Sequence, residues 1–466
     1  MKRLLIDSSF FQTRIVLAEG SEPIEMFYES KKQKSIVGNI YAGRVTSVLK
    51  GMQACFVDIG EDKNAYLPLN GKNIKCDSSL CVQVEKDAYG QKGAVLTDKL
   101  SLTGTFVVLI PDDDGIGISK KITDADERDR IFAILQEVRP SDFGVIVRTE
   151  GMGKSRDEFK KEIDELILSA ETVKKAQYIK APSLLRSDDD TVIRAVRELF
   201  TSDVDEVVIN DKMYFDKVMS VIRHSPEKIR LYEQSVPLME NFGVESRLDR
   251  LFQNKVWLKS GGFIIIEQTE ACAVIDVNTG KFTGKRDIQE TFLKTNIEAA
   301  DAIAKEIRLR NLSGIIIVDF IDMKLAQNRE ILKSHLEAAV KKDRIKTTVV
   351  GMTELGLMQI TRKKTSIPLL SQTGDTCLCC SGKGVVPSAE YTAGRILREI
   401  VSIFSSTAYR NLRVSSNKYV ISAVSAKEKV YITETEKRFN AKIELKEIET
   451  AAFDYYEIEK MAYKTD

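Results

Sequence analysis

Two aspartates in this sequence each end an apolar run. Asp276 closes "ACAVID" (271–276), and Asp319 closes "GIIIVD" (314–319). Functional groups of α/β sheets tend to lie just beyond the carboxyl ends of strands. If the two runs form neighbouring strands, their carboxylates lie close together, repel each other and favour a bound cation. The pattern predicts a Mg²⁺ site that meets a phosphate, as in a metal-dependent phosphodiester or phosphoryl enzyme.

Other polar residues accompany the two aspartates, and a purely structural interpretation stays open. Asn278 follows Asp276 by two positions, so it shares the same strand face and can hold that carboxylate by a hydrogen bond. Asp322 is a further acid within reach, although it can also cap the helix that follows. A strand-end aspartate often caps the next turn, and two matched cases weaken that alternative without removing it.

A cluster of cysteines forms a second candidate site. Cys377 and Cys380 have the C-x₂-C spacing at which two thiolates reach one Zn²⁺. A structural zinc normally takes four ligands, and the sequence has no second C-x₂-C. One solution is a zinc shared between two copies of the chain, and a redox-active or idle pair is the alternative. Cys379 is an additional thiol inside the motif.

Composition limits the class of protein. A chain of 466 residues is expected to form two to four folded units. Its 70 basic and 69 acidic residues give a net charge of +1, which excludes a globally basic nucleic-acid coat. No apolar run approaches the roughly 18 residues of a membrane span, and the N-terminus is too polar for a signal peptide. The seven cysteines, an odd number, are scattered except for the one cluster, which favours a reducing cytoplasm over a disulfide framework.

Periodicity predicts a multidomain α/β protein with a small β-barrel. Short strands are expected in 1–35, and turn-punctuated strands typical of a barrel in 36–97. Residues 98–192 mix strands with a charged helix, and 193–250 alternate helix and strand. Residues 251–372 alternate strands and helices as a layered α/β domain with partly parallel strands. The remaining segments are the cysteine motif and a mixed tail, 373–384 and 385–466.

Three motifs in this order resemble the ribonuclease E/G family of bacterial endoribonucleases: "IDVNTGKFTG", "TNIEAADAIAKEIRLRNLSGIIIVDFIDM" and "CLCCSGKG". The likeness extends to Gly384, is weaker in the tail and favours the compact kind of the family. It implies Mg²⁺-dependent cleavage of single-stranded, A/U-rich RNA to 5′-monophosphate and 3′-hydroxyl ends, in rRNA and tRNA processing and mRNA decay. Asp276 and Asp319 fall on the family's metal ligands, and Asn278 on the residue that orients the first.

The same resemblance implies an architecture. Segments 1–35 and 193–250 match a ribonuclease-H-like subdomain, split by an S1 (OB-type) domain and a 5′ sensor. Segment 251–372 matches a DNase-I-like catalytic subdomain. Segment 373–384 matches a zinc link that joins protomers into a homodimer or a dimer of dimers. Leu378 replaces the usual proline of that motif. Asp7 resembles a ribonuclease H acid, but we assign it no catalytic role.

The resemblance also assigns RNA contacts in the barrel. Phe56 and Tyr66 occupy the family's aromatic positions, where exposed rings stack on bases, and Lys92 matches its backbone-contacting lysine. From the pattern alone, the two aromatics can equally be core residues of a small barrel. Two basic groups are further candidates for a phosphate channel, although charge runs are more often solvated. They are Lys281, Lys285, Arg286 and Arg362, Lys363, Lys364.

Arg148 and Thr149, in "FGVIVRTEG", fall on the family's 5′ sensor, which favours RNA ends that carry a monophosphate. An arginine fork and a hydroxyl can bind such a phosphate. The alternative is an arginine that neutralises a nearby acid. Glu150 departs from the motif, which usually has a small residue there. Two rival classes are a catalytically silent S1-domain RNA-binding protein and an α/β phosphatase, but both acids are present and no P-loop occurs.

Overall fold

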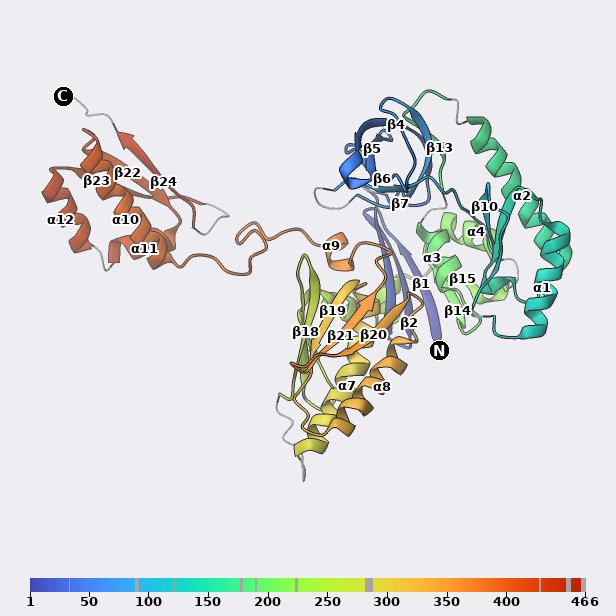
Figure 1. Ribbon diagram of the computed structural model, residues 1–466. Helices are drawn as coiled ribbons and strands as arrows, with labels where there is room; N and C mark the ends of the chain where they lie inside the picture. The colour runs from blue at the N-terminus through green and yellow to red at the C-terminus, as the bar shows by residue number, and fades with distance from the viewer. Residues whose placement is uncertain are drawn as a thin grey trace. The chain divides into compact units, whose positions relative to one another are not determined.

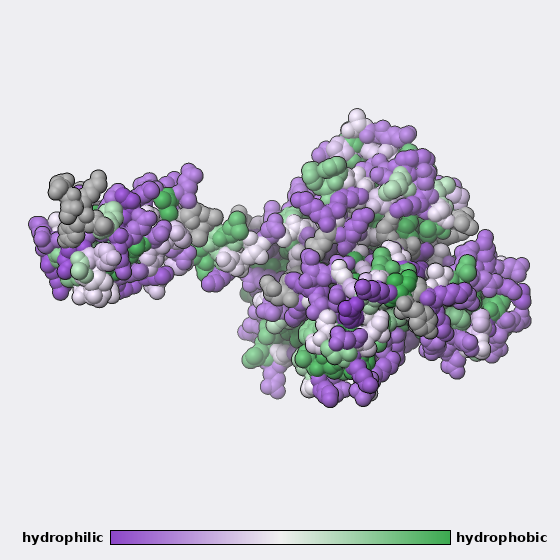
Figure 2. All heavy atoms as spheres, turned by 90° about the horizontal axis from the view of Figure 1, so that it is seen from above, coloured by the Kyte–Doolittle hydropathy of each residue, from purple (hydrophilic) through white to green (hydrophobic). Residues whose placement is uncertain are grey.

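The computed structural model divides the chain into two compact units, Met1–Thr373 and Gly374–Asp466. It describes residues 1–32, 34–88, 92–120, 122–176, 179–188, 191–222, 225–280, 288–426, 429–449 and 454–461. In this part of the chain no helix is both long enough and apolar enough to cross a bilayer. On the face shown in Figure 2, hydrophilic residues cover much of each unit, with hydrophobic groups between them. The fold is mixed α/β with a closed β-barrel.

The first unit contains a five-stranded sheet of order β15-β14-β1-β2-β3 (Figure 1). β1 pairs in parallel with β14, so strands from both ends of a long stretch of chain share one sheet. Helices α3 and α4 pack on one face, and α5, α6 and α9 on the other. These elements are β1 (Lys2–Ser8), β2 (Gln12–Glu19), β3 (Glu22–Ser30), α3 (Thr191–Leu199), β14 (Glu206–Ile209), α4 (Lys212–Val221), β15 (Ile229–Leu231), α5 (Leu238–Asn241), α6 (Glu245–Leu248) and α9 (Leu369–Thr373).

Asp7 of this first sheet has a structural partner for each carboxylate oxygen. Arg14 Nη2 donates to one oxygen at 2.6 Å, and Asn210 Nδ2 donates to the other at 2.6 Å. Arg14 also binds Glu245 at 2.6 Å. The carboxylate therefore braces β1 against its neighbours.

The barrel follows. β4, β5, β6, β8 and β7 close into five strands because β4 also pairs with β7, and β13 extends the sheet beside β4. Alternate side chains of these strands form a single core. The strands are β4 (Ile40–Leu49), β5 (Ala54–Asp58), β6 (Ala65–Pro68), β7 (Ser79–Lys86), β8 (Val95–Thr97) and β13 (Ser183–Arg186).

A four-stranded sheet of order β11-β12-β10-β9 comes next in the first unit. Helices α1 and α2 pack against it through an apolar stripe that includes Ile131, Leu135, Phe159 and Ile163. Asp124 caps α1 by accepting from the backbone N–H groups of its first turn. The elements are β9 (Leu102–Thr103), β10 (Val107–Pro111), β11 (Ile116–Ile118), α1 (Ala125–Val138), β12 (Phe143–Val147) and α2 (Arg156–Ala176).

A separate sheet of the first unit, hereafter the six-stranded sheet, has the order β16-β17-β18-β19-β21-β20. Helices α7 and α8 lie side by side on one face of it (Figure 1) and bury the alternate residues of its strands. The opposite face carries exposed side chains, among them Val274, Ile315 and Val350. The elements are β16 (Lys255–Trp257), β17 (Phe263–Gln268), β18 (Cys272–Asn278), α7 (Ile288–Leu309), β19 (Gly314–Asp319), α8 (Ala326–Val340), β20 (Thr347–Met352) and β21 (Leu357–Arg362).

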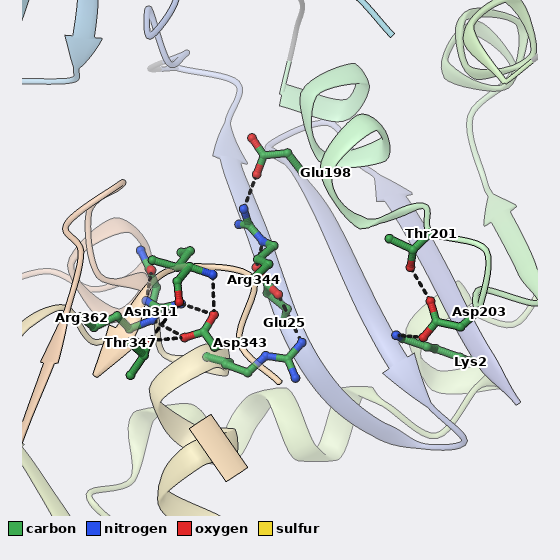
Figure 3. Close-up of polar contacts among 12 residues, drawn as sticks. Lys2, Glu25, Glu198, Thr201, Asp203, Asn311, Asp343, Arg344, Thr347 and Arg362 are labelled. Atoms are coloured by element: carbon green, nitrogen blue, oxygen red, sulfur yellow. Dashed lines mark hydrogen bonds and ion pairs between the residues drawn. The ribbon is translucent and has the colours of Figure 1, made fainter. Parts of the chain in front are cut away.

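Charged side chains join the six-stranded sheet's domain to the first sheet (Figure 3). Arg344, in the loop after α8, forms ion pairs with Glu25 of β3 and with Glu198 of α3. Its pKa is raised because these two acids outweigh the effect of burial. Arg308 of α7 reaches the same Glu25 at 3.5 Å. The carboxylate of Glu25 is buried, and an unpaired charge there would destabilise the interface. The two arginines compensate that charge.

Arg362 is the last residue of β21 and corrects one prediction. It is 2% exposed, and its guanidinium binds Asp343 at 2.7 Å and the side chain of Asn311 at 2.7 Å (Figure 3). A buried, fully paired arginine cannot line a phosphate channel, whereas Lys363 and Lys364 beside it are exposed. The other three basic candidates, Lys281, Lys285 and Arg286, lie outside the described residues.

The second unit has its own core. Its three-stranded sheet has the order β23-β22-β24, with β22 parallel to β23 and antiparallel to β24. Helix α10 supplies an apolar face that includes Ile396, Ile400 and Phe404. The elements are α10 (Ala389–Ser406), β22 (Asn411–Ser416), α11 (Lys418–Ala426), α12 (Lys429–Phe439), β23 (Lys442–Glu447) and β24 (Tyr456–Met461).

Candidate active site and RNA-contacting surfaces

Asp276 and Asp319 are direct partners in the ladder between β18 and β19. The two strands are parallel neighbours, as the sequence predicted, and their last paired residues are these two aspartates. Side chains at paired positions leave the same face of a sheet, and neighbouring strands are about 4.8 Å apart. The even residues of β18 and the odd residues of β19 face the exposed side, opposite α7 and α8. Both carboxylates therefore lie near the carboxyl ends of these two central strands, on the exposed face of the sheet.

Asn278 has the contact that the sequence predicted. Its Nδ2 donates to Asp276 Oδ2 at 2.6 Å, which fixes the orientation of that carboxylate. The turn after it is shaped by glycines: Gly280 has a φ of +58°, and a Cβ there would lie 2.4 Å from the carbonyl oxygen of Gly261. A Cβ on Gly262 would lie 2.7 Å from the carbonyl oxygen of Asn278. The Asn-Thr-Gly sequence is thus held against the β16–β17 turn at close approach.

The loop after β19 is fixed by Asn296, a residue that the sequence reasoning missed. Asn296 lies on α7 and is fully buried. Its Nδ2 donates to the carbonyl of Ile321 at 2.8 Å, and its Oδ1 accepts from the N–H of Ile321 at 3.1 Å. Asparagine can satisfy both backbone groups at once because its amide has a donor and an acceptor. The clamp sets the position of the backbone between Asp319 and Asp322.

Asp322 lies in the same cleft as the aspartate pair. The cleft has a volume of about 360 Å³ and is lined by Asp276, Val277, Asn278, Thr279, Phe292, Asp319, Phe320, Ile321 and Asp322. The alternative that Asp322 caps the following helix is wrong. The N-cap of α8 is Leu325, and no side chain caps that helix end.

The donor set of this cleft fits a hard divalent cation. Carboxylate oxygens are the ligands that Mg²⁺ takes, usually one or two with water completing the shell. Among the described residues, no lysine or arginine forms an ion pair with Asp276, Asp319 or Asp322. Nor do three His, Cys, Asp or Glu side chains form a metal-binding group anywhere in the described ranges. Asp276 and Asp319 are the two carboxylates that could hold such an ion.

The two barrel aromatics lie on the outer surface. Phe56 and Tyr66 are register partners on β5 and β6, with ring centroids 6.4 Å apart and planes at 72°. Both are half-buried, whereas the alternate residues of the same strands fill the core. The interpretation of the two rings as barrel core is therefore wrong. Lys92 is exposed and lies two residues before Ala94, whose carbonyl accepts from the N–H of Tyr66 at 2.7 Å.

Arg148 follows β12 and is largely committed to protein contacts. Its Nη1 donates to the carbonyl of Gly104 at 3.2 Å, and its Nη2 to that of Arg197 at 3.1 Å. Its Nε faces Glu150 Oε2 at 3.9 Å. The Thr149 hydroxyl hydrogen-bonds that of Ser119 at 3.2 Å. The arginine thus ties this sheet to α3, and its Nε faces the carboxylate of Glu150.

The cysteine motif forms a tight knuckle in the second unit. The N–H of Gly384 donates to Cys380 Sγ at 3.3 Å, and this bond, with Cys377 and nearby backbone N–H groups, lowers the pKa of Cys380. Positive φ angles at Ser381, Gly382 and Gly384 bend the chain around the thiol. A stabilised thiolate beside Cys377 fits the chemistry of Zn²⁺ ligation. Cys379 is exposed.

The sequence is similar to known proteins over most of its length. The sequence profile of the Ribonuclease E/G family matches residues 101–365, and that of the RNase E/G thioredoxin-like domain matches residues 376–461. Ribonuclease G of Haemophilus influenzae is 35% identical over 458 residues, 92% of both chains. Ribonuclease G of Escherichia coli is 34% identical over 462 residues, 93% of this chain and 94% of that one.

Ribonuclease E of Haemophilus influenzae is 34% identical over 425 residues, which are 85% of this chain and 45% of that longer one. The structure is that of a multidomain α/β protein with two acidic residues paired at the ends of neighbouring strands. The chain belongs to the ribonuclease E/G family.

Proposed function

We propose that this protein is a Mg²⁺-dependent endoribonuclease that cleaves single-stranded, A/U-rich RNA and leaves 5′-monophosphate and 3′-hydroxyl ends. The observation that carries the proposal is the register pairing of Asp276 with Asp319 on parallel strands. Family membership and the names of relatives that are ribonucleases G and E support the reaction class. In this proposal the protein acts in rRNA and tRNA processing and mRNA decay, in the bacterial cytoplasm.

The residues of the cleft have distinct parts in this proposal. Asp276 and Asp319 hold the cation, and Asn278 keeps Asp276 in the orientation that its hydrogen bond defines. When bound, Mg²⁺ supplies an activated water and neutralises charge on the phosphate oxygens. Phe56 and Tyr66 stack on bases while Lys92 contacts the backbone. The six-stranded sheet then corresponds to a DNase-I-like catalytic subdomain, the barrel to an S1 domain and the first sheet to a ribonuclease-H-like support.

The second part of the proposal is a zinc link. Cys377 and Cys380 of one protomer supply two of four thiolates, and the partner supplies the others, which gives a homodimer or a dimer of dimers. The lowered pKa of Cys380 and the knuckle around its sulfur support this assignment. A zinc with two ligands from one chain is incomplete without a second copy.

A cleavage assay tests the catalytic proposal. A labelled single-stranded RNA should be cut internally with Mg²⁺, and the products should carry 5′-monophosphate ends. Asp319→Asn keeps the shape of the side chain but removes its charge, so cleavage should fall by at least about 100-fold, and excess EDTA should stop it. Full activity in either case would refute the metal site. RNA binding by the inactive variant shows that its fold is intact.

A further inference from the structure

Three side chains outside the cleft form a cation–aromatic platform on the same face of the sheet. Lys255 Nζ lies 4.0 Å from the ring centroid of Trp257 and 3.6 Å from that of Phe263. The two rings meet edge to face with centroids 5.4 Å apart. The side chain of Trp257 is 64% exposed, although it is a large aromatic residue.

Strand register places this platform beside the catalytic pair. Trp257 pairs with Phe263, and Phe263 pairs with Asn278. Two residues before Trp257 on the same strand, Lys255 pairs with Ile265, which in turn pairs with Asp276. Directly paired residues share a sheet face, so the platform and the two aspartates face the same side. At about 4.8 Å per strand, the backbone of Trp257 is about 10 Å from that of Asn278.

The chemistry of the platform suits an unpaired nucleobase with its phosphate. An exposed aromatic ring stacks on any base, and a cation beside it adds an attraction to the phosphate. Lys255 is exposed, and no carboxylate of a described residue forms an ion pair with it. A neighbouring apolar partner would leave that charge uncompensated, whereas RNA supplies the opposite charge. Charge and exposure therefore favour RNA over an apolar protein surface.

We propose that Trp257, Phe263 and Lys255 form a subsite that stacks one unpaired base next to the scissile phosphate. The inference rests on the proposed endoribonuclease function and extends it to a specific part of the substrate. The base lies within one or two nucleotides of the cut bond, and Lys255 contacts a flanking phosphate. The subsite extends RNA contact from the cleft across β17 to the edge strand β16.

Trp257 is the single tryptophan of the sequence, so its fluorescence reports on the subsite directly. The full-length Asp319→Asn variant is titrated with a single-stranded RNA that contains the cleavage site. Tryptophan emission should be quenched in parallel with binding measured by RNA anisotropy. An abasic nucleotide at one position beside the cleavage site should remove the quenching, while abasic positions farther away should leave it.

Unchanged emission with saturating bound RNA, while the wild type still cleaves, would overturn the subsite and leave the proposed function in place. Emission that changes with protein concentration alone would overturn it in favour of a second copy on this face. Absence of both binding and cleavage would overturn the proposed function and the subsite with it.

Kinetics give an independent test. Trp257→Ala should raise KM by about 5- to 150-fold, the range expected for loss of a base-stacking contact, with little change in kcat. Trp257→Phe should restore most of the affinity. Phe132→Ala, which removes an exposed ring on α1, serves as the matched control. Thermal unfolding confirms that each variant is folded. A KM for Trp257→Ala equal to that of the control would refute the subsite.

Discussion

Asn296 holds Ile321 by both of its backbone polar groups, and through that contact α7 fixes the loop that follows β19. The amide is fully buried, so no water can replace either bond. Asp319 lies two residues before the clamped position, and Asp322 follows it directly. The geometry of the acidic cleft thus depends on a helix residue 25 positions away from the loop in sequence.

Asn296→Ala should destabilise the protein by about 1–3 kcal/mol, because the backbone N–H and C=O of the half-buried Ile321 lose their partners. Cleavage should fall even below the midpoint temperature, since the loop beside Asp319 is released. Single-turnover cleavage and thermal unfolding measure the two effects. Thr295→Val, at the adjacent buried position, removes a hydroxyl that donates to the carbonyl of Thr291 within α7. It should affect stability without affecting the chemical step, and equal catalytic loss in both variants would contradict the clamp.

Phe56→Ala and Tyr66→Ala should each weaken RNA binding by about 5- to 150-fold while leaving the barrel folded. The reason is that both rings lie outside the barrel core. Lys92→Ala removes one contact to a phosphate, so it should reduce the slope of log K for RNA binding against log salt concentration by about 1. Binding titrations at several salt concentrations measure both. Loss of the folded state in Phe56→Ala would show that the ring supports the core after all.

Glu150→Gln should increase the preference for RNA with a 5′-monophosphate. The prediction rests on the 5′-sensor role that the family resemblance implies for Arg148: the Glu150 carboxylate lies 3.9 Å from Arg148 Nε, so its charge would oppose a phosphate bound by that arginine. The ratio of kcat/KM for 5′-monophosphate and 5′-hydroxyl forms of one RNA should rise several-fold. Asp157→Asn makes the same charge change at a 93% exposed side chain of α2 and should leave the ratio unchanged. An equal response of the two variants would indicate a general charge effect.

Arg362→Met should destabilise the first unit by about 3–5 kcal/mol, because it leaves Asp343 buried without its cation. The two side chains are 1% and 2% exposed. Lys212→Met breaks an exposed pair with Asp216 and should change stability by at most about 0.5 kcal/mol. Urea unfolding of both variants provides the comparison. Similar destabilisation of the two would contradict a special role for burial.

The Asp343–Arg362 pair also predicts a pH dependence. Burial opposes ionisation of Asp343, but the hydrogen bond and charge of Arg362 outweigh it, so its pKa lies below the ordinary value. The contribution of this pair to the free energy of unfolding is fully present above the pKa of an aspartate in the unfolded chain, roughly 3.9. It is lost as the pH falls through the lower pKa of Asp343 in the folded protein. The stability advantage of wild type over Arg362→Met should therefore shrink below about pH 4. An advantage that stays constant from pH 7 to pH 3 would contradict this linkage.

Cys377→Ser and Cys380→Ser should each lose bound zinc and lower the mass of the assembly, because each removes one thiolate from both copies and so two of the four ligands of the proposed shared zinc. Cys379→Ser is the matched control within the same turn, and it should retain the bound zinc and the mass of the assembly. Metal analysis and sedimentation equilibrium measure the outcome. Loss of zinc from the Cys379 variant alone would reassign the ligands.

Much of the catalytic region was predictable because its signals are local. The apolar runs before Asp276 and Asp319 specify buried strands, and the intervening helical period specifies α7, so parallel neighbours follow. Asn278 was predictable because strand geometry places it two positions from Asp276. The outward position of Phe56 was also available in principle, since Cys55 and Val57 alternate with it as apolar core residues.

Other features depended on contacts between distant segments. The role of Asn296 requires Ile321 as its partner, and nothing in the helical pattern indicates that contact. Arg362 looked like part of a basic surface group, but its neighbour in space is Asp343, which burial hides from a sequence pattern. The alternative of Asp322 as a helix cap failed because α8 begins at Ala326, four residues farther along, and its N-cap is Leu325. Each of these features depends on tertiary contacts that a local sequence pattern does not show.

The ladder between β18 and β19 has an evolutionary consequence. Successive side chains of a strand point to opposite faces, so inserting or deleting one residue ahead of either aspartate would turn its carboxylate into the apolar layer beneath. Relatives of this chain should consequently tolerate length variation in surface connections but almost none within these two short segments. Gaps in alignments of homologues should avoid both of them, whatever the divergence of the residues between.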